Sequence, residues 1–275
     1  MHVWRVRRYI STHYLAPRMV FAASGAVEHD QITDLVGTHF GGVPTEAPAG
    51  LTYEDSPSLF TGADVRDYND DMETAHFALA FEGLKWTDPD IFSLMLCQSL
   101  LGTYDAKRSG QALTGSKLAS DISKLGADVK LMQPFCTCYT DTGLFGVYVE
   151  MGMAKKEHVD DTIGTIQEEL VAMTTGVSED ALLAAKAQLK FNMMSQMDGT
   201  SPNAEEIGRQ MLVYGRRMSL AETFARIDGI EADDVTRVAE KIIWDQEVAF
   251  AAMGPNLKYA YDINGLRRGT YWNRL

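Results

Sequence analysis

Residues 129–151, VKLMQPFCTCYTDTGLFGVYVEM, decide the fold class of this 275-residue chain. Residues 129–139 and 144–151 are rich in apolar, β-branched and aromatic side chains, and they flank the turn-forming sequence Thr140-Asp141-Thr142-Gly143. This pattern predicts two antiparallel strands joined as a hairpin. Other short apolar runs predict three more strands, at residues 61–68, 75–82 and 248–253.

Helical patterns fill the chain around these strands. Asp88 is suited to cap a helix that has Pro89 at its first position and continues to about Leu101. Apolar residues at three- and four-residue spacing, with caps, predict further helices at residues 116–125, 158–173, 178–197, 202–214, 220–227 and 233–243. Because strands, helix, strands, helices and a last strand follow in this order, we predict an α+β fold: a mostly antiparallel sheet with helices packed on one face.

The first 60 residues differ from the rest. We predict a helix at residues 3–14, a strand at 18–24 and a helix at 29–40, too little chain to close a core, so this segment is expected to complete a sheet supplied by other residues. Residues 41–60 hold three prolines and three glycines, which indicates an interdomain linker or a long surface loop. Residues 102–115 are predicted to be a second loop, without the Gly-Lys-Ser/Thr ending of a phosphate-binding loop.

Charge limits the classes of partner. The net charge of −13 makes duplex nucleic acid a poor partner, whereas a basic peptide or a basic subunit would be attracted; a solvated acidic surface is the simpler interpretation. No apolar run approaches the ~20 residues of a membrane helix, so we predict no transmembrane segment. Residues 1–27 carry Arg5, Arg7, Arg8 and Arg18 but no acid, as in a mitochondrial transit peptide. We favour a helix of a folded domain, because the apolar run at 19–23 is typical of a strand and a transit peptide would not normally continue into one.

The three cysteines argue against a disulfide framework, because they are few and odd in number. Cys136 and Cys138 alternate along a predicted strand, so both thiols are expected on one face, and Cys97 lies in a predicted helix. No second cysteine pair or histidine cluster accompanies them, and we interpret them as packed, unreactive thiols.

Seven phrases together carry a family resemblance: YISTHY at 9–14, PRMV at 17–20, YTDTGL at 139–144, DGTSP at 198–202, EIGRQ at 206–210, YGRR at 214–217 and RRGTYW at 267–272. In this order they resemble the mitochondrial β-type branch of the M16 (pitrilysin-type) family, which includes processing peptidase β subunits and core 1 proteins of the cytochrome bc1 complex. The resemblance implies two related α+β domains. It places residues 1–42 at the end of the first, 43–60 in the linker and 61–275 as the complete second domain.

The resemblance also directs attention to zinc. Peptidases of this family hold zinc with an inverted His-x-x-Glu-His helix in the first domain, and none of the six histidines here (2, 13, 29, 39, 76 and 158) has that motif. An Arg and a Tyr that hold substrate in many active members fall on Ser123 and Lys130, which cannot replace them. We therefore predict no catalytic, cofactor-binding or metal-binding residue in this chain; zinc enters only if an amino-terminal half supplies it.

The functional expectations follow from this resemblance. We expect a non-catalytic core subunit 1 of mitochondrial respiratory complex III, on the matrix face of the inner membrane, bound to a core 2/α-type subunit. The alternative is the carboxy-terminal half of an active processing peptidase that cleaves basic presequences; an incomplete amino terminus is a further alternative. In the family, acidic surfaces inside the cavity between subunits bind arginine-rich presequences. The resemblance therefore suggests that Asp70, Asp71 and Glu73 attract presequences, although a simple acidic loop is the plainer interpretation, and that Glu82 would face this cavity. The aromatic tail, with Tyr259, Tyr261, Tyr271 and Trp272, either wraps another subunit or folds back on its own domain.

Overall fold

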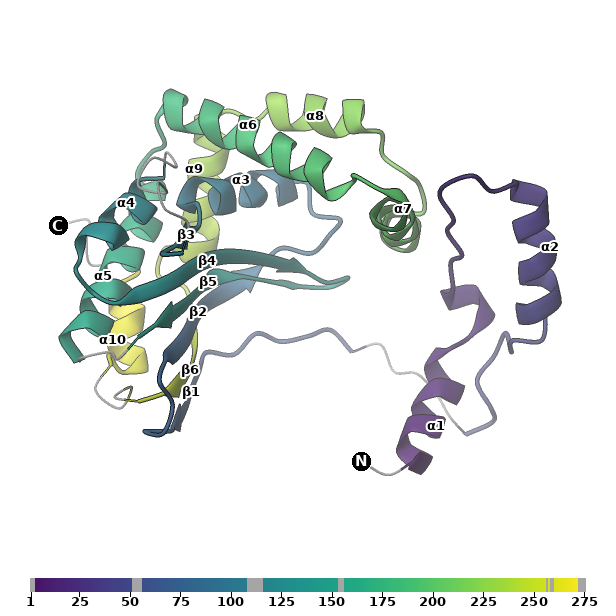
Figure 1. The fold of residues 1–275 in the computed structure, drawn as a ribbon, viewed down its shortest axis with the longest axis horizontal. Coiled ribbons are helices and arrows are strands. Elements are labelled where there is room, and N and C mark those ends of the chain that lie inside the picture. Colours follow the sequence, from purple (N-terminus) through teal and green to yellow (C-terminus); the bar gives the residue numbers. More distant parts are fainter. Residues whose placement is uncertain are drawn as a thin grey trace. The chain divides into compact units, whose positions relative to one another are not determined.

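The computed structural model describes residues 3–50, 56–107, 116–152, 156–255, 257 and 260–271. The chain divides into two compact units (Figure 1). The first comprises residues 1–57 and 191–222, and the second comprises residues 58–190 and 223–275. The predicted division into domain remnant, linker and second domain stays a prediction. No helix in the described part of the chain has the length and apolar character needed to cross a membrane.

The second unit is built on a six-stranded sheet of order β1-β6-β2-β5-β4-β3. Its strands are β1 (Ala63–Tyr68), β2 (Ala75–Gly83), β3 (Tyr104–Asp105), β4 (Val129–Cys138), β5 (Gly143–Met151) and β6 (Ala249–Gly254). Neighbouring strands run antiparallel except β1 and β6, which pair in parallel. The mostly antiparallel α+β prediction and the hairpin of β4 and β5 are confirmed.

One face of the sheet forms the core. Alternate residues of β2 and β5 are buried there, and the helices α3 (Ile91–Leu101), α4 (Lys117–Lys124), α5 (Lys156–Met173) and α9 (Ala232–Ile243) form the layer above them (Figure 1). The largest fully buried side chains are aromatic: Phe77, Phe81, Phe145 and Phe250. Since each contributes about 1.5–3 kcal/mol by leaving water, this layer provides the main stabilisation of the second unit.

The first unit contains α1 (Val3–His13), the 3-10 turn η1 (Ala16–Arg18), α2 (His29–Phe40) and α7 (Thr200–Tyr214). The 18-residue helix α6 (Glu179–Gln196) and the nine-residue helix α8 (Leu220–Asp228) begin in one unit and end in the other. In α1, α2 and α7 the only buried residue is Thr12. The first unit therefore has helices but almost no core of its own.

Four sequence predictions need correction. Residues 18–24 are not a strand, because a strand needs a hydrogen-bonded neighbour and none among the described residues pairs with them. The predicted loop at 102–115 contains β3, whose two residues pair with β4; residues 108–115 lie outside the described part. The helix expected from Pro89 begins at Ile91, and the helix expected from Pro202 begins at Thr200.

Local hydrogen bonds explain these helix starts. The Asp90 N–H donates to Asp88 Oδ1 (2.9 Å), so Asp88 closes a turn before the helix and Asp90 takes the N-cap position. Pro202 fits inside the first turn of α7, where backbone N–H groups have no intrahelical partner to lose. The two errors are thus small displacements along the chain and leave the helices themselves in place.

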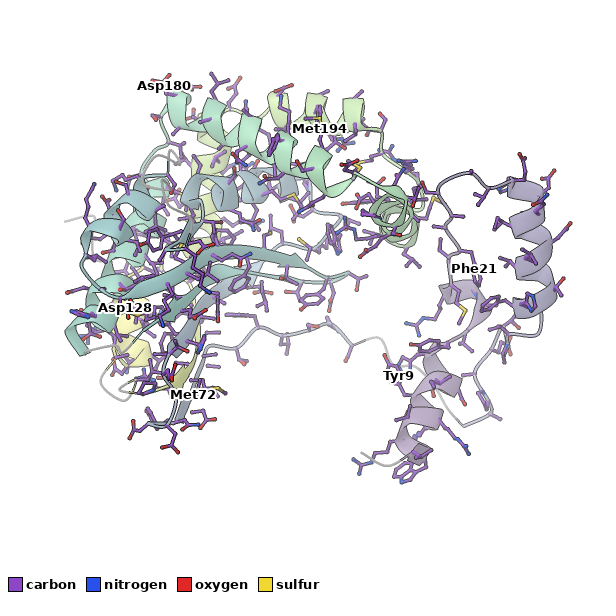
Figure 2. All side chains as sticks on the ribbon, in the orientation of Figure 1. Tyr9, Phe21, Met72, Asp128, Asp180 and Met194 are labelled. Carbon is purple, nitrogen blue, oxygen red and sulfur yellow. The ribbon has the colours of Figure 1, made fainter. Side chains whose placement is uncertain are left out.

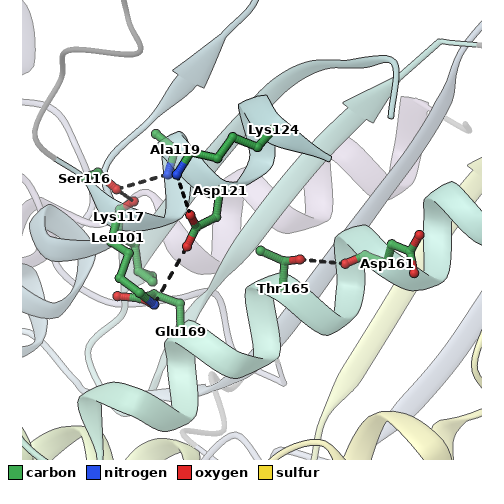
Figure 3. Close-up of polar contacts among 9 residues, drawn as sticks. All are labelled: Leu101, Ser116, Lys117, Ala119, Asp121, Lys124, Asp161, Thr165 and Glu169. Carbon is green, nitrogen blue, oxygen red and sulfur yellow. Dashed lines mark hydrogen bonds and ion pairs between the residues drawn. The ribbon is translucent and has the colours of Figure 1, made fainter. Parts of the chain in front are cut away.

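The start of α4 shows how side chains fix a junction (Figure 3). Ser116 Oγ accepts from the Ala119 N–H (3.3 Å) and donates to the Leu101 carbonyl, so one hydroxyl caps α4 and holds the end of α3. Lys117 then reaches Glu169 of α5, which ties α4 to its neighbour. Gly102, at φ +63°, has room only for a hydrogen, because a Cβ there would lie 2.5 Å from Ser116 Cβ.

The described part of the tail folds back on its own unit. Leu266 of α10 (Ile263–Arg268) is fully buried, and the buried Gln167 Nε2 donates to its carbonyl (2.5 Å). Tyr261 and Tyr271 remain exposed at the surface, while Tyr259 and Trp272 lie outside the described residues. Of the two alternatives left open by the sequence, the contacts of residues 260–271 support fold-back.

Candidate functional site

The candidate site is the face of the sheet opposite the core helices, here called the open sheet face. Strand register places the even-numbered residues of β2 and β5 on this face together with the odd-numbered residues of β6 and β1. Its members include Val65, Asp67, His76, Ala78, Ala80, Glu82, Gln133, Phe135, Gly146, Tyr148, Glu150, Ala249, Ala251 and Met253.

Small side chains make much of this face flat. Ala78, Ala80 and Ala251 sit side by side on β2 and β6, and Gly146 lies beneath the ring of Phe135. A Cβ at Gly146 would come within 2.8 Å of Phe135 Cζ, so the glycine allows the ring to lie on the strand. A floor of alanine and glycine lets another backbone approach the sheet closely.

A polar row crosses this floor. His76 Nε2 lies 2.8 Å from Thr74 Oγ1, and His76 Nδ1 lies 2.8 Å from Tyr148 Oη. Glu150 is the cross-strand partner of His76. Burial, and to a lesser degree the nearby Glu150 carboxylate, raises the pKa of Tyr148 above its usual value of 10.0, so the phenol stays neutral at physiological pH. The row thus presents a neutral hydroxyl beside a carboxylate.

Carboxylates give this face an acidic character. Glu82 is exposed and its Oε1 accepts from Thr142 Oγ1 (3.0 Å). Glu150 on the neighbouring strand β5 and Asp67 on the edge strand β1 lie on the same face of the sheet. The acidic cluster weighed from the sequence, Asp70 and Asp71 with Glu73, lies in the exposed turn after β1. The Asp71 N–H donates to Asn69 Oδ1, which makes this cluster a local turn.

Ser123 and Lys130, which occupy the positions of the family's substrate-holding Arg and Tyr, do not form a site. Ser123 is exposed on α4, where its hydroxyl donates to the Ser120 carbonyl (2.6 Å). Lys130 lies where β4 bulges, between Val129 and Leu131, and its carbonyl accepts from the Ala106 N–H. Neither residue belongs to the polar row of the open sheet face.

The thiols behave as packed side chains. Cys136 and Cys138 lie 3.9 Å apart between their sulfur atoms, as expected for neighbours on one face of a strand. Burial raises the pKa of the Cys97 thiol to about 12, and the hydrogen bond with Cys138, with burial, raises the pKa of Cys136. Protonated thiols are weak nucleophiles and weak metal ligands.

Zinc does not fit the residues that the structure describes. In those ranges, no three histidine, cysteine, aspartate or glutamate side chains come together in a way that could hold a metal ion. His76 has both ring nitrogens within hydrogen-bond distance of hydroxyls, as expected for a packed strand histidine. That the chain as a whole has no metal site stays a prediction.

Sequence reasoning missed Tyr148, Thr74 and Glu150. The alternation of β5 was a usable signal, because it places Tyr148 and Glu150 on the face opposite Phe145 and Val149. The pairing of β5 with His76 was not readable, because register between separate strands is set by the whole sheet.

Comparison with known proteins identifies a family that this chain matches. The family model described as "Peptidase M16 inactive domain" matches residues 4–189. A probable mitochondrial-processing peptidase subunit beta of Arabidopsis thaliana is 43% identical over 98% of this chain and 50% of its own length. Cytochrome b-c1 complex subunit 1 of Homo sapiens is 37% identical over 97% of this chain and 54% of its own length.

A solved structure agrees in fold. A chain of "Complex III2 from Candida albicans, Inz-5 bound" matches 98% of this chain and 63% of its own length, with a TM-score of 0.84 at 23% identity. The present chain spans about half the length of the curated relatives it matches. With the family model covering most of the chain and the fold in agreement, the chain belongs to the M16 peptidase family, through its inactive domain.

Proposed function

We propose that this chain is a non-catalytic core subunit of mitochondrial respiratory complex III, a scaffold on the matrix face of the inner membrane. The observation that carries the proposal is the likeness to cytochrome b-c1 complex subunit 1 along 97% of this chain, together with the match to an inactive domain of a peptidase family. A core 2/α-type subunit is the expected direct partner.

The surfaces support a packing role. The first unit exposes large apolar side chains on α1 and α2, among them Trp4 (57% exposed) and Leu35 (54% exposed). Exposed apolar surface of this kind is typical of protein interfaces. The second unit adds a flat, alanine-rich sheet face. Both features suit a protein that is held among other subunits.

Purification from mitochondria tests this role. A tagged copy of the chain should bring down cytochrome-containing complex III in stoichiometric amount, and cryo-EM of that complex should show density for the chain. A fully assembled, active complex III that lacks this density refutes the proposed scaffold role.

A second function is favoured by the acids of the open sheet face. Asp67, Glu82 and Glu150 would attract arginine side chains, and the flat floor would accept an extended peptide. We infer that the chain alternatively forms the carboxy-terminal half of a presequence peptidase, with zinc held by an amino-terminal half. The Arabidopsis thaliana relative, a probable processing peptidase β subunit, supports this alternative.

Kinetics with charge variants test the second function. The chain would be combined with a zinc-bearing amino-terminal half and given a presequence peptide rich in arginine. Because an exposed ion pair contributes about 0.2–1 kcal/mol, Glu82→Gln with Glu150→Gln should raise KM about 2- to 30-fold, and added salt should reduce this difference. Asp180→Asn, on the first turn of α6, is the matched charge control. Absence of zinc-dependent cleavage refutes the peptidase role.

A further inference from the structure

The pair of thiols on β4 has no part in either role proposed above. Side chains of this strand alternate between the two faces of the sheet (Figure 2), and Cys136 and Cys138 share the core face with the buried Met132. Their sulfur atoms lie 3.9 Å apart, in hydrogen-bond contact, and neither cysteine is in a disulfide. The two sulfur atoms are therefore already neighbours in the folded protein.

The three cysteines differ in their access to solvent. Cys136 is partly exposed, whereas Cys138 is 7% exposed. Cys97 is fully buried in α3, and its sulfur lies 3.9 Å from the Val235 carbonyl of α9. A small molecule that arrives from solvent therefore meets the Cys136 sulfur first, and the Cys138 sulfur is next to it.

Strand geometry allows a covalent bond between these two sulfur atoms, near the limit of what a disulfide tolerates. Residues two apart on a strand have Cα atoms about 6.4–6.8 Å apart, because each residue advances the chain by about 3.2–3.4 Å. Disulfides accept Cα separations of about 4.4–6.8 Å and are most common at about 5.5–6 Å. Closing the bond would therefore shorten the end of β4. A disulfide made at this limit is easily reduced again, as regulatory disulfides are.

The end of the strand is the part that can move when the bond closes. Cys136 pairs with Phe145, whose side chain is fully buried, so this position is fixed by the core. Cys138 is the last residue of β4 and pairs with Gly143, the first residue of β5. Shortening of β4 therefore displaces Cys138 and the turn that follows it.

That turn holds two other segments of the second unit. The Ser58 N–H donates to Asp141 Oδ2 (2.7 Å), which ties the turn to the chain that leads into β1. The Trp86 N–H donates to the Tyr139 carbonyl (3.1 Å), which ties it to the chain between β2 and α3. A change at Cys138 is thus passed on to both segments.

We propose that Cys136 and Cys138 are a redox-sensitive modification site, at which a low-molecular-weight disulfide such as glutathione disulfide produces an intrastrand disulfide and displaces the turn at residues 139–143. The Cys136 sulfur attacks the oxidant, forms a mixed disulfide and releases one glutathione thiolate. The Cys138 sulfur then attacks the Cys136 sulfur and releases the second. The two thiol protons end on the two glutathiones, so the cysteine pair loses two electrons and one glutathione disulfide gains them.

Protonation of these thiols makes the reaction slow but does not oppose it at equilibrium. The hydrogen bond with Cys138, together with burial, raises the pKa of Cys136, so its thiolate is rare at neutral pH. The rate of exchange follows the thiolate fraction, whereas the extent of oxidation follows the reduction potentials of the pair and of its surroundings. We therefore expect oxidation over minutes to hours, in buffers rich in glutathione disulfide. The proposal is independent of the two roles above.

Equilibration in glutathione buffers tests the modification. The 275-residue chain would be incubated at a series of ratios of oxidised to reduced glutathione, quenched with acid, unfolded in urea and alkylated. Cys136 and Cys138 lie together on the tryptic peptide of residues 131–155, so its mass reports their state. At high ratios this peptide should lose two hydrogens and carry no alkyl group, and reduced glutathione should reverse the change. A peptide alkylated at both cysteines at every ratio, or one that carries only glutathione adducts, overturns the proposal.

Cysteine variants identify the partner. Cys97→Ser keeps the pair and should form the same disulfide at the same ratios as the unmodified chain. Cys136→Ser removes the exposed member of the pair, so no intramolecular disulfide should form. If Cys97→Ser abolishes the disulfide, Cys97 is the partner and the proposal is wrong. Far-UV circular dichroism verifies that each variant is folded, and the Cys97→Ser result decides the matter if Cys136→Ser does not fold.

Hydrogen exchange tests the displacement of the turn. Oxidation should speed amide exchange at Ser58 and Trp86 about threefold or more, because their hydrogen bonds to the turn open more often. The amides of Val147 and Val149, in the middle of β5, should exchange as in the reduced protein. An oxidised chain in which Ser58 and Trp86 exchange at the reduced rate would contradict the proposed movement.

Discussion

Removing the side chain of Leu266 should release the tail from the second unit. Leu266 is fully buried, and truncating a buried leucine to alanine costs about 2–5 kcal/mol. The six-residue helix α10 is too short to stay helical once it leaves the second unit. The variant therefore loses at most the free energy with which the tail binds to that unit. The hydrogen bond from Gln167 to the Leu266 carbonyl is retained by the backbone. We therefore expect Leu266→Ala to lose about 2–3 kcal/mol, in the lower half of that range.

Hydrogen exchange distinguishes detachment from global unfolding. A loss of about 2–3 kcal/mol corresponds to opening of residues 263–271 that is about 30- to 150-fold more frequent. Amides of β2 and β5 should exchange as before if only the tail detaches. Asn264→Ala, exposed on the same helix, is the matched control. Equal exchange in the two variants would refute the docking of the tail through Leu266.

Three further predictions concern the second unit. The guanidinium of Arg237 donates two hydrogen bonds to the Asp90 carboxylate and lowers the pKa of Asp90 below 3.8, so this stabilisation is present above pH 3.8 and is lost as the pH falls through the lower folded-state value. Arg237→Gln should cost about 0.2–1 kcal/mol at pH 7 and progressively less as the pH falls below 3.8, measured by urea unfolding. Cys97, with a pKa of about 12, should resist iodoacetamide at pH 8 until urea unfolds the protein. Gly102→Ala and Gly126→Ala both place alanine at φ +63°, but only Gly102 faces a clash, so its variant should melt lower, with an extra loss of about 1–3 kcal/mol.

Local signals were sufficient for most elements of the second unit. The strands β2 and β5 and the helix α5 follow directly from alternating or helically spaced apolar residues, because one face of each is buried. Observed helix boundaries differ from the predicted ones where two residues could each serve as the N-cap, as Asp88 and Asp90 could before α3. The two-residue β3 was not predictable, since so short a strand has no period of its own.

Pairing between distant segments was the part that sequence could not provide. The parallel pairing of β1 with β6 joins residues 186 positions apart, such as Ala63 and Ala249, and no local pattern records it. The same holds for the candidate site, where His76 and Tyr148 meet only because β2 and β5 adopt one register. The family resemblance predicted the fold and left this geometry open.

The wrong strand prediction at residues 18–24 has a different cause from the other errors. Val20 and Phe21 are strand-forming residues and Met19 has an extended backbone, but no backbone hydrogen bond to another described segment accompanies them. In the second unit, Phe77, Phe145 and Phe250 are buried by that unit's own helices, whereas no apolar residue of α1 or α2 is buried. The spacing of apolar residues indicates which face of a segment is suited to burial, whether or not the residues that would cover that face lie in the same 275 residues. The second unit therefore has its own buried core, whereas the apolar side chains of α1 and α2 stay at least partly exposed within the described residues.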